Sequence, residues 1–357
     1  MSGAADYLPL LWVGVAAAAI LTYVLLDGWV LGVGILYPLV ARQTDRDRLI
    51  ESIAPFWKAN ETWLILGATL LLIGFPTAYP LLVTQLYLPI FALLFALAVR
   101  VASHALRHQR GPLGRIWAMA FAGGSILATL AQGYIVGRLI EGSGGHGLTS
   151  AWIGWVRQFF PIICSFGLLG GYGLLGACWL ISKADGALQV MGREVSPSTL
   201  VLTATVMVAV CVFTPLVSPH VAHRWFEPSM RIVLAPLAVT AAAAIWQLWT
   251  SPWRSTDHRP LRWAAALLVV AFAGVAISLY PYLVPYQFTF YELANDRAFL
   301  TFAGVGLCVV LPVFLLYLLH GYRTRRGKIR RANIPVVGSP ALASRKTSGN
   351  NVDLHLS

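Results

Sequence analysis

Long apolar runs separated by short polar stretches dominate the chain. Each run is long enough to cross the roughly 30 Å hydrocarbon core of a bilayer as a helix of about 20 residues. The runs cover residues 9–39, 53–76, 81–103, 113–139, 158–182, 198–217, 231–249, 261–283 and 298–320. The pattern therefore predicts an all-α, polytopic membrane protein with about nine transmembrane helices.

Composition agrees with a membrane protein. Of the 357 residues, 58% are hydrophobic and only 11% are charged, and the mean hydropathy is +0.71. Soluble domains carry about 25% charged residues. The net charge of +12 does not indicate a nucleic-acid partner, because the basic residues stand at the ends of the apolar runs and in the C-terminal tail, as topology signals do. We expect contact with membrane lipids and none with nucleic acid.

The basic residues also predict the orientation. Of the 26 lysines and arginines, 21 fall on one side of the nine runs, and Arg100 is counted among them. Because cytoplasmic loops carry the excess of Lys and Arg, we expect a periplasmic N-terminus and a cytoplasmic C-terminus. Residues 1–331 are predicted to form the transmembrane domain. Residues 332–357, rich in serine, asparagine and small residues, are predicted to form a disordered basic cytoplasmic tail.

Asp27 is the acidic residue deepest inside an apolar run. A carboxylate near the centre of a membrane helix costs roughly 2.5–3.5 kcal/mol on insertion scales. Asp27 should therefore face protein or water rather than lipid. Two interpretations remain open: a carboxylate on a proton path, or an acid that hydrogen-bonds a neighbouring helix and serves packing alone.

A second polar group lies near the start of the second run and contains Trp57, Lys58, Asn60 and Glu61. Lys58 and Glu61 are three residues apart, so they share a helix face and can pair. The group is interpreted either as a hydrophilic path for protons from the cytoplasm or as an interfacial belt of the kind that anchors membrane helices.

The chain lacks the motifs of an enzyme that acts alone. It has no Walker motif, no GxGxxG sequence after a strand and no nucleophile elbow. Its four cysteines form no CxxC pair. His104 and His108 have helical spacing but stand at the basic rim, whereas a haem ligand would be expected deep in a span. We expect no catalytic residue, cofactor site or metal site in this chain.

Two of these polar segments carry a family resemblance. The sequence DGWVLGVG at 27–34 resembles the DGFDLGVG signature in the first helix of subunit II of the cytochrome bd quinol oxidases. The sequence SIAPFWKANETWL at 52–64 is similar to that family's NSIAPxWDGNEVWL. Shorter matches follow in the same order, and the resemblance covers about residues 8–330.

The resemblance implies a fold of two four-helix bundles with a peripheral helix. It implies a haem-free subunit that is catalytic only with its partner, subunit I, which carries haem b and haem d type cofactors. A small single-helix accessory subunit can accompany this heterodimer. The complex, in the bacterial inner membrane, oxidises quinol, reduces O2 to water and generates a proton gradient.

The sequence departs from the family pattern at two acids. Val30 stands where the family has the second acid of DGFD, and Lys58 stands at the acid of WDGN. In the family the latter acid is associated with proton uptake, and Glu61, one turn further on, could substitute for it. These changes resemble a divergent branch similar to the cyanide-insensitive oxidases.

Two other classes of protein remain as alternatives. A secondary transporter also uses broken helices and midplane carboxylates. However, one deep carboxylate and an odd number of spans do not favour a simple inverted repeat. An assembly protein would be compatible with the lack of haem ligands.

Overall fold

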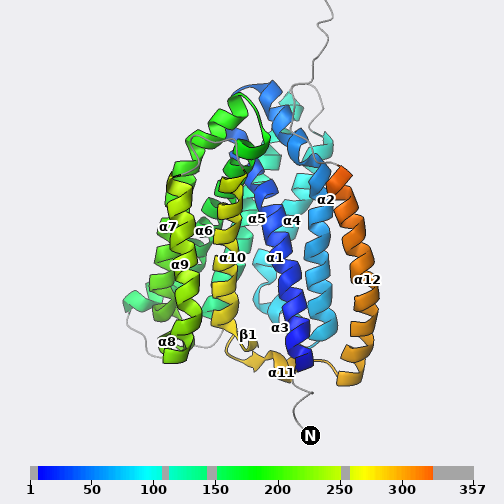
Figure 1. Cartoon of the computed structure of the whole chain (residues 1–357), viewed down its shortest axis with the longest axis vertical. Helices are drawn as coiled ribbons and strands as arrows, with labels where there is room; N and C mark the ends of the chain where they lie inside the picture. Colours follow the sequence, from blue (N-terminus) through cyan, green and yellow to red (C-terminus); the bar gives the residue numbers. More distant parts are fainter. Residues whose placement is uncertain (1–6, 107–111, 143–150, 251–257, 325–357) are drawn as a thin grey trace, which may run out of the picture.

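The computed structural model describes residues 7–106, 112–142, 151–250 and 258–324, and within these ranges the backbone is mostly helical (Figure 1). The long helices are α1 (Tyr7–Leu36), α2 (Gln43–Gly74), α4 (Tyr87–Leu106), α5 (Pro112–Glu141), α6 (Ala151–Lys183), α7 (Ala187–Val217), α9 (Pro228–Thr250), α10 (Arg259–Leu279) and α12 (Arg297–Thr324). The short elements are η1 (Tyr37–Leu39), α3 (Ala78–Gln85), α8 (Pro219–Phe226), β1 (Tyr282–Val284), β2 (Phe288–Thr289) and α11 (Phe290–Leu293). The predicted tail, 332–357, lies outside the described residues.

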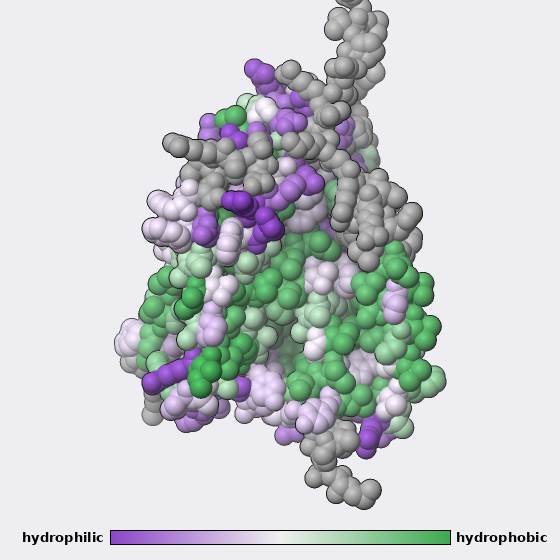
Figure 2. All heavy atoms as spheres, in the orientation of Figure 1, coloured by the Kyte–Doolittle hydropathy of each residue, from purple (hydrophilic) through white to green (hydrophobic). Residues whose placement is uncertain are grey.

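One long helix occupies each of the nine predicted runs. Eight helices in the described part of the chain are long and apolar enough to cross a membrane. The remaining predicted run, 53–76, lies in α2, whose apolar part is the shorter segment Asn60–Gly74. Hydrophobic residues form a band across the middle of the surface in Figure 2, hydrophilic residues gather at the upper end, and the lower end is mixed. The fold is therefore all-α and membrane-spanning, as the sequence predicts.

The predicted boundaries of the third run were wrong. Its helix is broken at Leu86, so the short α3 ends at Gln85 and the long α4 begins at Tyr87. Pro89 stands in the first turn of α4, where its missing N–H costs nothing. As a result α4 starts later and ends later than predicted, at Leu106 rather than 103.

The eighth run ends earlier than predicted, because α10 stops at Leu279 and Pro281 follows two residues later. The chain then forms a small antiparallel hairpin in which Tyr282 lies opposite Thr289. Beyond the hairpin, the backbone N–H of Asn295 donates to the carbonyl of Gly74 at the end of α2, at 2.9 Å. This extended segment therefore connects α10 to α12 across the end of the molecule where the N-terminus lies (Figure 1).

The nine long helices pack as two groups. In the first, α1 packs against α2 and α5, and α4 packs against α5. In the second, α6, α7, α9 and α10 contact one another in a ring. Helix α12 lies at the edge, against α2 (Figure 1). This arrangement agrees with two bundles and a peripheral helix.

The two groups meet where α1 and α5 pack against α6, and α1 crosses α6 at very close range. A Cβ on Gly32 would lie 1.9 Å from the carbonyl oxygen of Tyr172, and one on Gly176 would lie 2.4 Å from the carbonyl carbon of Gly32. Only glycine allows the two backbones to approach this closely. Near the crossing, the rings of Trp29 and Trp179 stack with their centroids 3.8 Å apart. The crossing fixes the first helix of one bundle against the first helix of the other.

Candidate functional site

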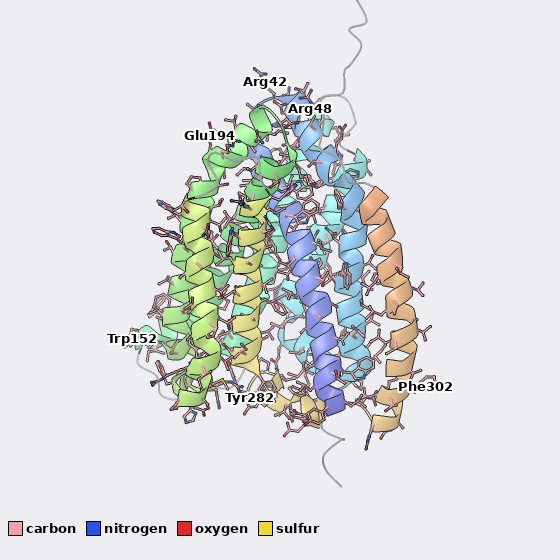
Figure 3. The ribbon with its side chains drawn as sticks, viewed as in Figure 1. Arg42, Arg48, Trp152, Glu194, Tyr282 and Phe302 are labelled. Carbon is pink, nitrogen blue, oxygen red and sulfur yellow. The ribbon has the colours of Figure 1, made fainter. Side chains whose placement is uncertain are left out.

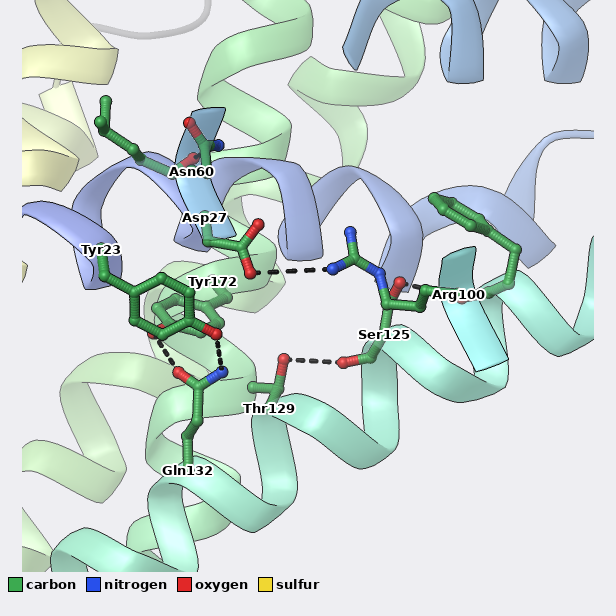
Figure 4. A network of polar contacts seen from close by, with 10 residues as sticks. Tyr23, Asp27, Asn60, Arg100, Ser125, Thr129, Gln132 and Tyr172 are labelled. Carbon is green, nitrogen blue, oxygen red and sulfur yellow. Dashed lines mark hydrogen bonds and ion pairs between the residues drawn. The ribbon is translucent and has the colours of Figure 1, made fainter. Parts of the chain in front are cut away.

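A buried ion pair links α1 to α4. The Nη1 atom of Arg100 lies 3.7 Å from Oδ2 of Asp27, and the two side chains are 0% and 1% exposed (Figure 4). The Arg100 guanidinium also lies over the ring of Phe121 on α5, 5.5 Å from its centroid. Two buried charges are retained in such a setting only when they neutralise each other or serve a function.

Helix α5 makes room for the arginine. A Cβ on Gly124 would lie 2.8 Å from Cγ of Arg100 and 3.0 Å from the carbonyl oxygen of Ala96. The glycine lets α4 and α5 pack closely while the long arginine side chain runs between them. The cation is thereby directed away from lipid and towards α1.

Helix α2 contributes the next polar groups. Asn60 is fully buried, and its Nδ2 donates to the carbonyl oxygen of Leu26 at 2.7 Å, directly beside Asp27. Glu61 lies close enough to Asp27 to act on its carboxyl electrostatically. Three of the five predicted path residues thus meet around one point. The side chains of the other two, Trp57 and Lys58, lie outside the described part of the structure.

Helices α5 and α6 complete the polar cluster with side chains that the sequence analysis missed. Tyr172 donates through its hydroxyl to Oε1 of Gln132 at 2.8 Å. Gln132 donates through Nε2 to the hydroxyl of Tyr23 at 3.0 Å. Tyr23 lies one helical turn before Asp27 on α1. All three side chains are buried, and the cluster draws on five helices in total (Figure 4).

The structure corrects the predicted position of Arg100. Its place near the end of the predicted third run put it among the solvated cations of the basic rim. The structure buries it completely instead and pairs it with Asp27. Asp27 therefore contacts a neighbouring helix through a cation, and both interpretations of this residue stay predictions.

Among the residues that the structure describes, no three His, Cys, Asp or Glu side chains come together as a metal site. The segment around His220 forms the short helix α8, and Nδ1 of His223 lies 3.4 Å from Oε1 of Glu227, the residue after the helix.

Comparison with known proteins places this cluster in a family context. Residues 8–325 match the family described as cytochrome bd terminal oxidase subunit II. The chain belongs to this family. A probable cytochrome oxidase subunit 2 from Haemophilus influenzae is 24% identical, over 91% of this chain and 96% of the relative. The cytochrome bd-I ubiquinol oxidase subunit 2 of Escherichia coli K12 is 22% identical, over 92% of this chain and 97% of the relative.

The fold is also shared with a solved structure. A chain in the structure of bd oxidase from Geobacillus thermodenitrificans superposes with a TM-score of 0.66 at 17% identity, covering 88% of this chain and 97% of that one. As a member of the family that matches residues 8–325, the protein is a subunit of a bd-type quinol oxidase, an oxidoreductase complex, and the transporter alternative is not favoured. The buried polar cluster therefore lies within an oxidase subunit.

Proposed function

We propose that the chain is the haem-free second subunit of a heterodimeric quinol oxidase whose partner, subunit I, carries the haem b and haem d type cofactors. The complex would oxidise quinol and reduce O2 to water. Family membership over residues 8–325 supports this assignment, as does likeness to a relative named as a ubiquinol oxidase subunit. A single-helix accessory subunit, also implied by the family, stays a prediction.

The N-terminus is proposed to lie on the periplasmic side and the C-terminus on the cytoplasmic side of the inner membrane. Arg42 and Arg48 mark the end of the molecule opposite the N-terminus (Figure 3). Lys183 and Arg193, which flank the turn from α6 to α7, lie on the same predicted side. Because positive residues stay on the cytoplasmic side, the charge distribution supports this orientation.

Within this subunit, Asp27 is proposed to be a carboxylate on the proton path, with Asn60, Glu61 and Arg100 around it. The observation that carries the proposal is the complete burial of the Asp27–Arg100 pair in a helix bundle. Ionisable groups at such positions in membrane proteins mark ion and proton pathways. Trp57 and Lys58 would form the cytoplasmic opening of the path.

Asp27→Asn should lower the quinol-oxidase turnover of the assembled complex several-fold, because an amide cannot take up and release a proton as a carboxyl group does. Turnover is measured as oxygen consumption per haem in purified complex, so that only assembled enzyme is counted. Asp27→Glu, which retains the carboxyl group, serves as the control. Unchanged turnover per haem in Asp27→Asn would remove Asp27 from the path.

Glu61→Gln tests whether this residue replaces the acid that Lys58 displaced. We expect a several-fold loss of turnover that grows as the pH rises, because fewer protons are then available to a path without its second acid. Glu51, an exposed residue on the same helix, provides the matched control Glu51→Gln. Equal pH profiles for Glu61→Gln and Glu51→Gln would exclude Glu61 from proton uptake.

A further inference from the structure

Residues 280–296 run between α10 and α12 across the end of the molecule where the N-terminus lies (Figure 1). The segment leaves the second bundle at the end of α10 and leads to the peripheral helix α12, which lies against α2 of the first bundle. Along its course it makes hydrogen bonds to α8, α5 and α2. The proton path proposed above gives this segment no role.

The start of the segment is held by α8, which packs against α7, α9 and α10 of the second bundle. The Nη1 atom of Arg224 donates to the carbonyl oxygen of Tyr280, and the guanidinium lies 5.0 Å from the centroid of the Tyr280 ring. Trp225 donates through Nε1 to the hydroxyl of Ser278, in the last turn of α10, at 2.9 Å. Two neighbouring residues of α8 therefore fix the start of the segment to the second bundle.

The hairpin in the middle of the segment is anchored to the end of α5. The hydroxyl of Tyr286 donates at 2.7 Å to the carbonyl oxygen of Ile140. Ile140 lies in the last turn of α5, where backbone carbonyls have no partner within their own helix. The ring of Tyr286 lies close to Gly142, where an added Cβ would come within 2.3 Å of it, and it stacks on the ring of His220 with the centroids 4.8 Å apart. Tyr286 therefore caps α5 from a distant part of the sequence.

The end of the segment caps α2 in the same way. The backbone N–H of Asn295 donates to the carbonyl oxygen of Gly74 at 2.9 Å, and its Nδ2 donates to the carbonyl oxygen of Ile73 at 3.2 Å. Both carbonyls belong to the last turn of α2, so one residue provides partners for two acceptors that the helix leaves free. Phe290 and Leu293, a few residues earlier, are buried in an apolar cluster with side chains of α1 and α2. This end of the segment is therefore packed as well as hydrogen-bonded.

We propose that residues 280–296 are a strap that couples the ends of α2 and α5 in the first bundle to the second bundle. A helix end opens readily when its free carbonyls lack partners. One short segment provides these partners for both helices and is itself fixed to α8, so opening of one helix end loosens the cap of the other. These helices also flank the buried ion pair, α2 through Asn60 beside Asp27 and α5 through Phe121 beside Arg100. The strap does not depend on any role of Asp27 in proton transfer.

Hydrogen–deuterium exchange of the purified complex tests this coupling. Tyr286→Phe removes the hydroxyl that caps α5. Asn295→Asp removes the amide donor to α2 but keeps a side-chain oxygen that accepts from the N–H of Asp296. Each variant should speed exchange roughly fivefold at the helix end that loses its cap, the effect of about one hydrogen bond, and by about twofold or more at the other. The helix ends are followed in peptides 70–75 and 137–142.

The response at the helix whose own cap is intact distinguishes a strap from two separate caps. Tyr282→Phe is the matched control, because it removes a hydroxyl from the same hairpin that has no hydrogen-bond partner in the described part of the chain. Faster exchange confined to the helix that lost its cap would overturn the strap, as would wild-type exchange in both variants or equal acceleration in Tyr282→Phe. Tyr286→Phe removes a single oxygen atom and should assemble, so it decides the question even if Asn295→Asp does not assemble.

Discussion

Asp27→Leu should destabilise the assembled protein by about 3–5 kcal/mol, and by more than Arg100→Met does. Both changes break an ion pair whose side chains are 1% and 0% exposed. They differ because arginine keeps its proton in proteins, whereas a buried carboxyl group can bind a proton and become neutral. Removing Asp27 therefore leaves a permanent cation in the core, and removing Arg100 leaves a group that can discharge itself.

The double variant Asp27→Leu/Arg100→Met should be more stable than Asp27→Leu alone, because an apolar pair replaces the buried charge. The measurement is the thermal unfolding midpoint of the purified complex in detergent. Arg115→Met, at an exposed position in the first turns of α5, is the control and should change little. A double variant as unstable as the sum of the single ones would show that the two side chains do not stabilise each other.

The membrane-spanning runs could be predicted because the length of each apolar run can be counted directly from the sequence. Asp27 and Asn60 could also be singled out from the sequence, because a polar side chain among apolar ones must find a partner. Both are buried in the structure, and both contact a neighbouring helix. Their roles in proton transfer are a separate matter, which only the turnover measurements test.

Arg100 was misplaced because the helix that carries it begins and ends later than its apolar run. The predicted run ended at 103, three residues after Arg100, whereas α4 reaches Leu106. The three additional residues of helix place Arg100 about 4.5 Å further from the end of α4 than predicted, at 1.5 Å per residue. The break at Leu86 that shifts the helix depends on how α3 and α4 pack, and packing is not visible in hydropathy.

The buried polar side chains of α5 follow a spacing that is visible in the sequence. Ser125, Thr129 and Gln132 follow one another at spacings of four and three residues, so they share one helix face. All three are buried. A polar stripe within an apolar run indicates a face turned towards the protein. The partners Tyr23 and Tyr172 could not have been found this way, because the sequence does not say which helices α5 touches.

The crossing of α1 and α6 is one of the contacts that join the two bundles, and Gly32→Ala should disrupt it. The added methyl group would lie 1.9 Å from the Tyr172 carbonyl oxygen. That atom belongs to a helix backbone and cannot rotate aside as a side chain would. We expect the free energy of unfolding to fall by about 3 kcal/mol, the upper end of the range for overpacked cores. The loss should appear as a lower unfolding midpoint and as less assembled oxidase in membranes.

Gly14→Ala separates this clash from any general effect of replacing glycine in α1. Position 14 lies on the same helix, but an added Cβ would meet no atom within 4 Å, so this variant should unfold at or slightly above the wild-type midpoint. Gly176→Ala enters the same crossing from α6, at 2.4 Å from the Gly32 backbone. Once one methyl group has separated the helices, the second causes a smaller clash. The double variant Gly32→Ala/Gly176→Ala should therefore lose less stability than the two single variants lose together. Strict additivity, or a Gly32→Ala protein as stable as Gly14→Ala, would mean that the two helices do not depend on this contact.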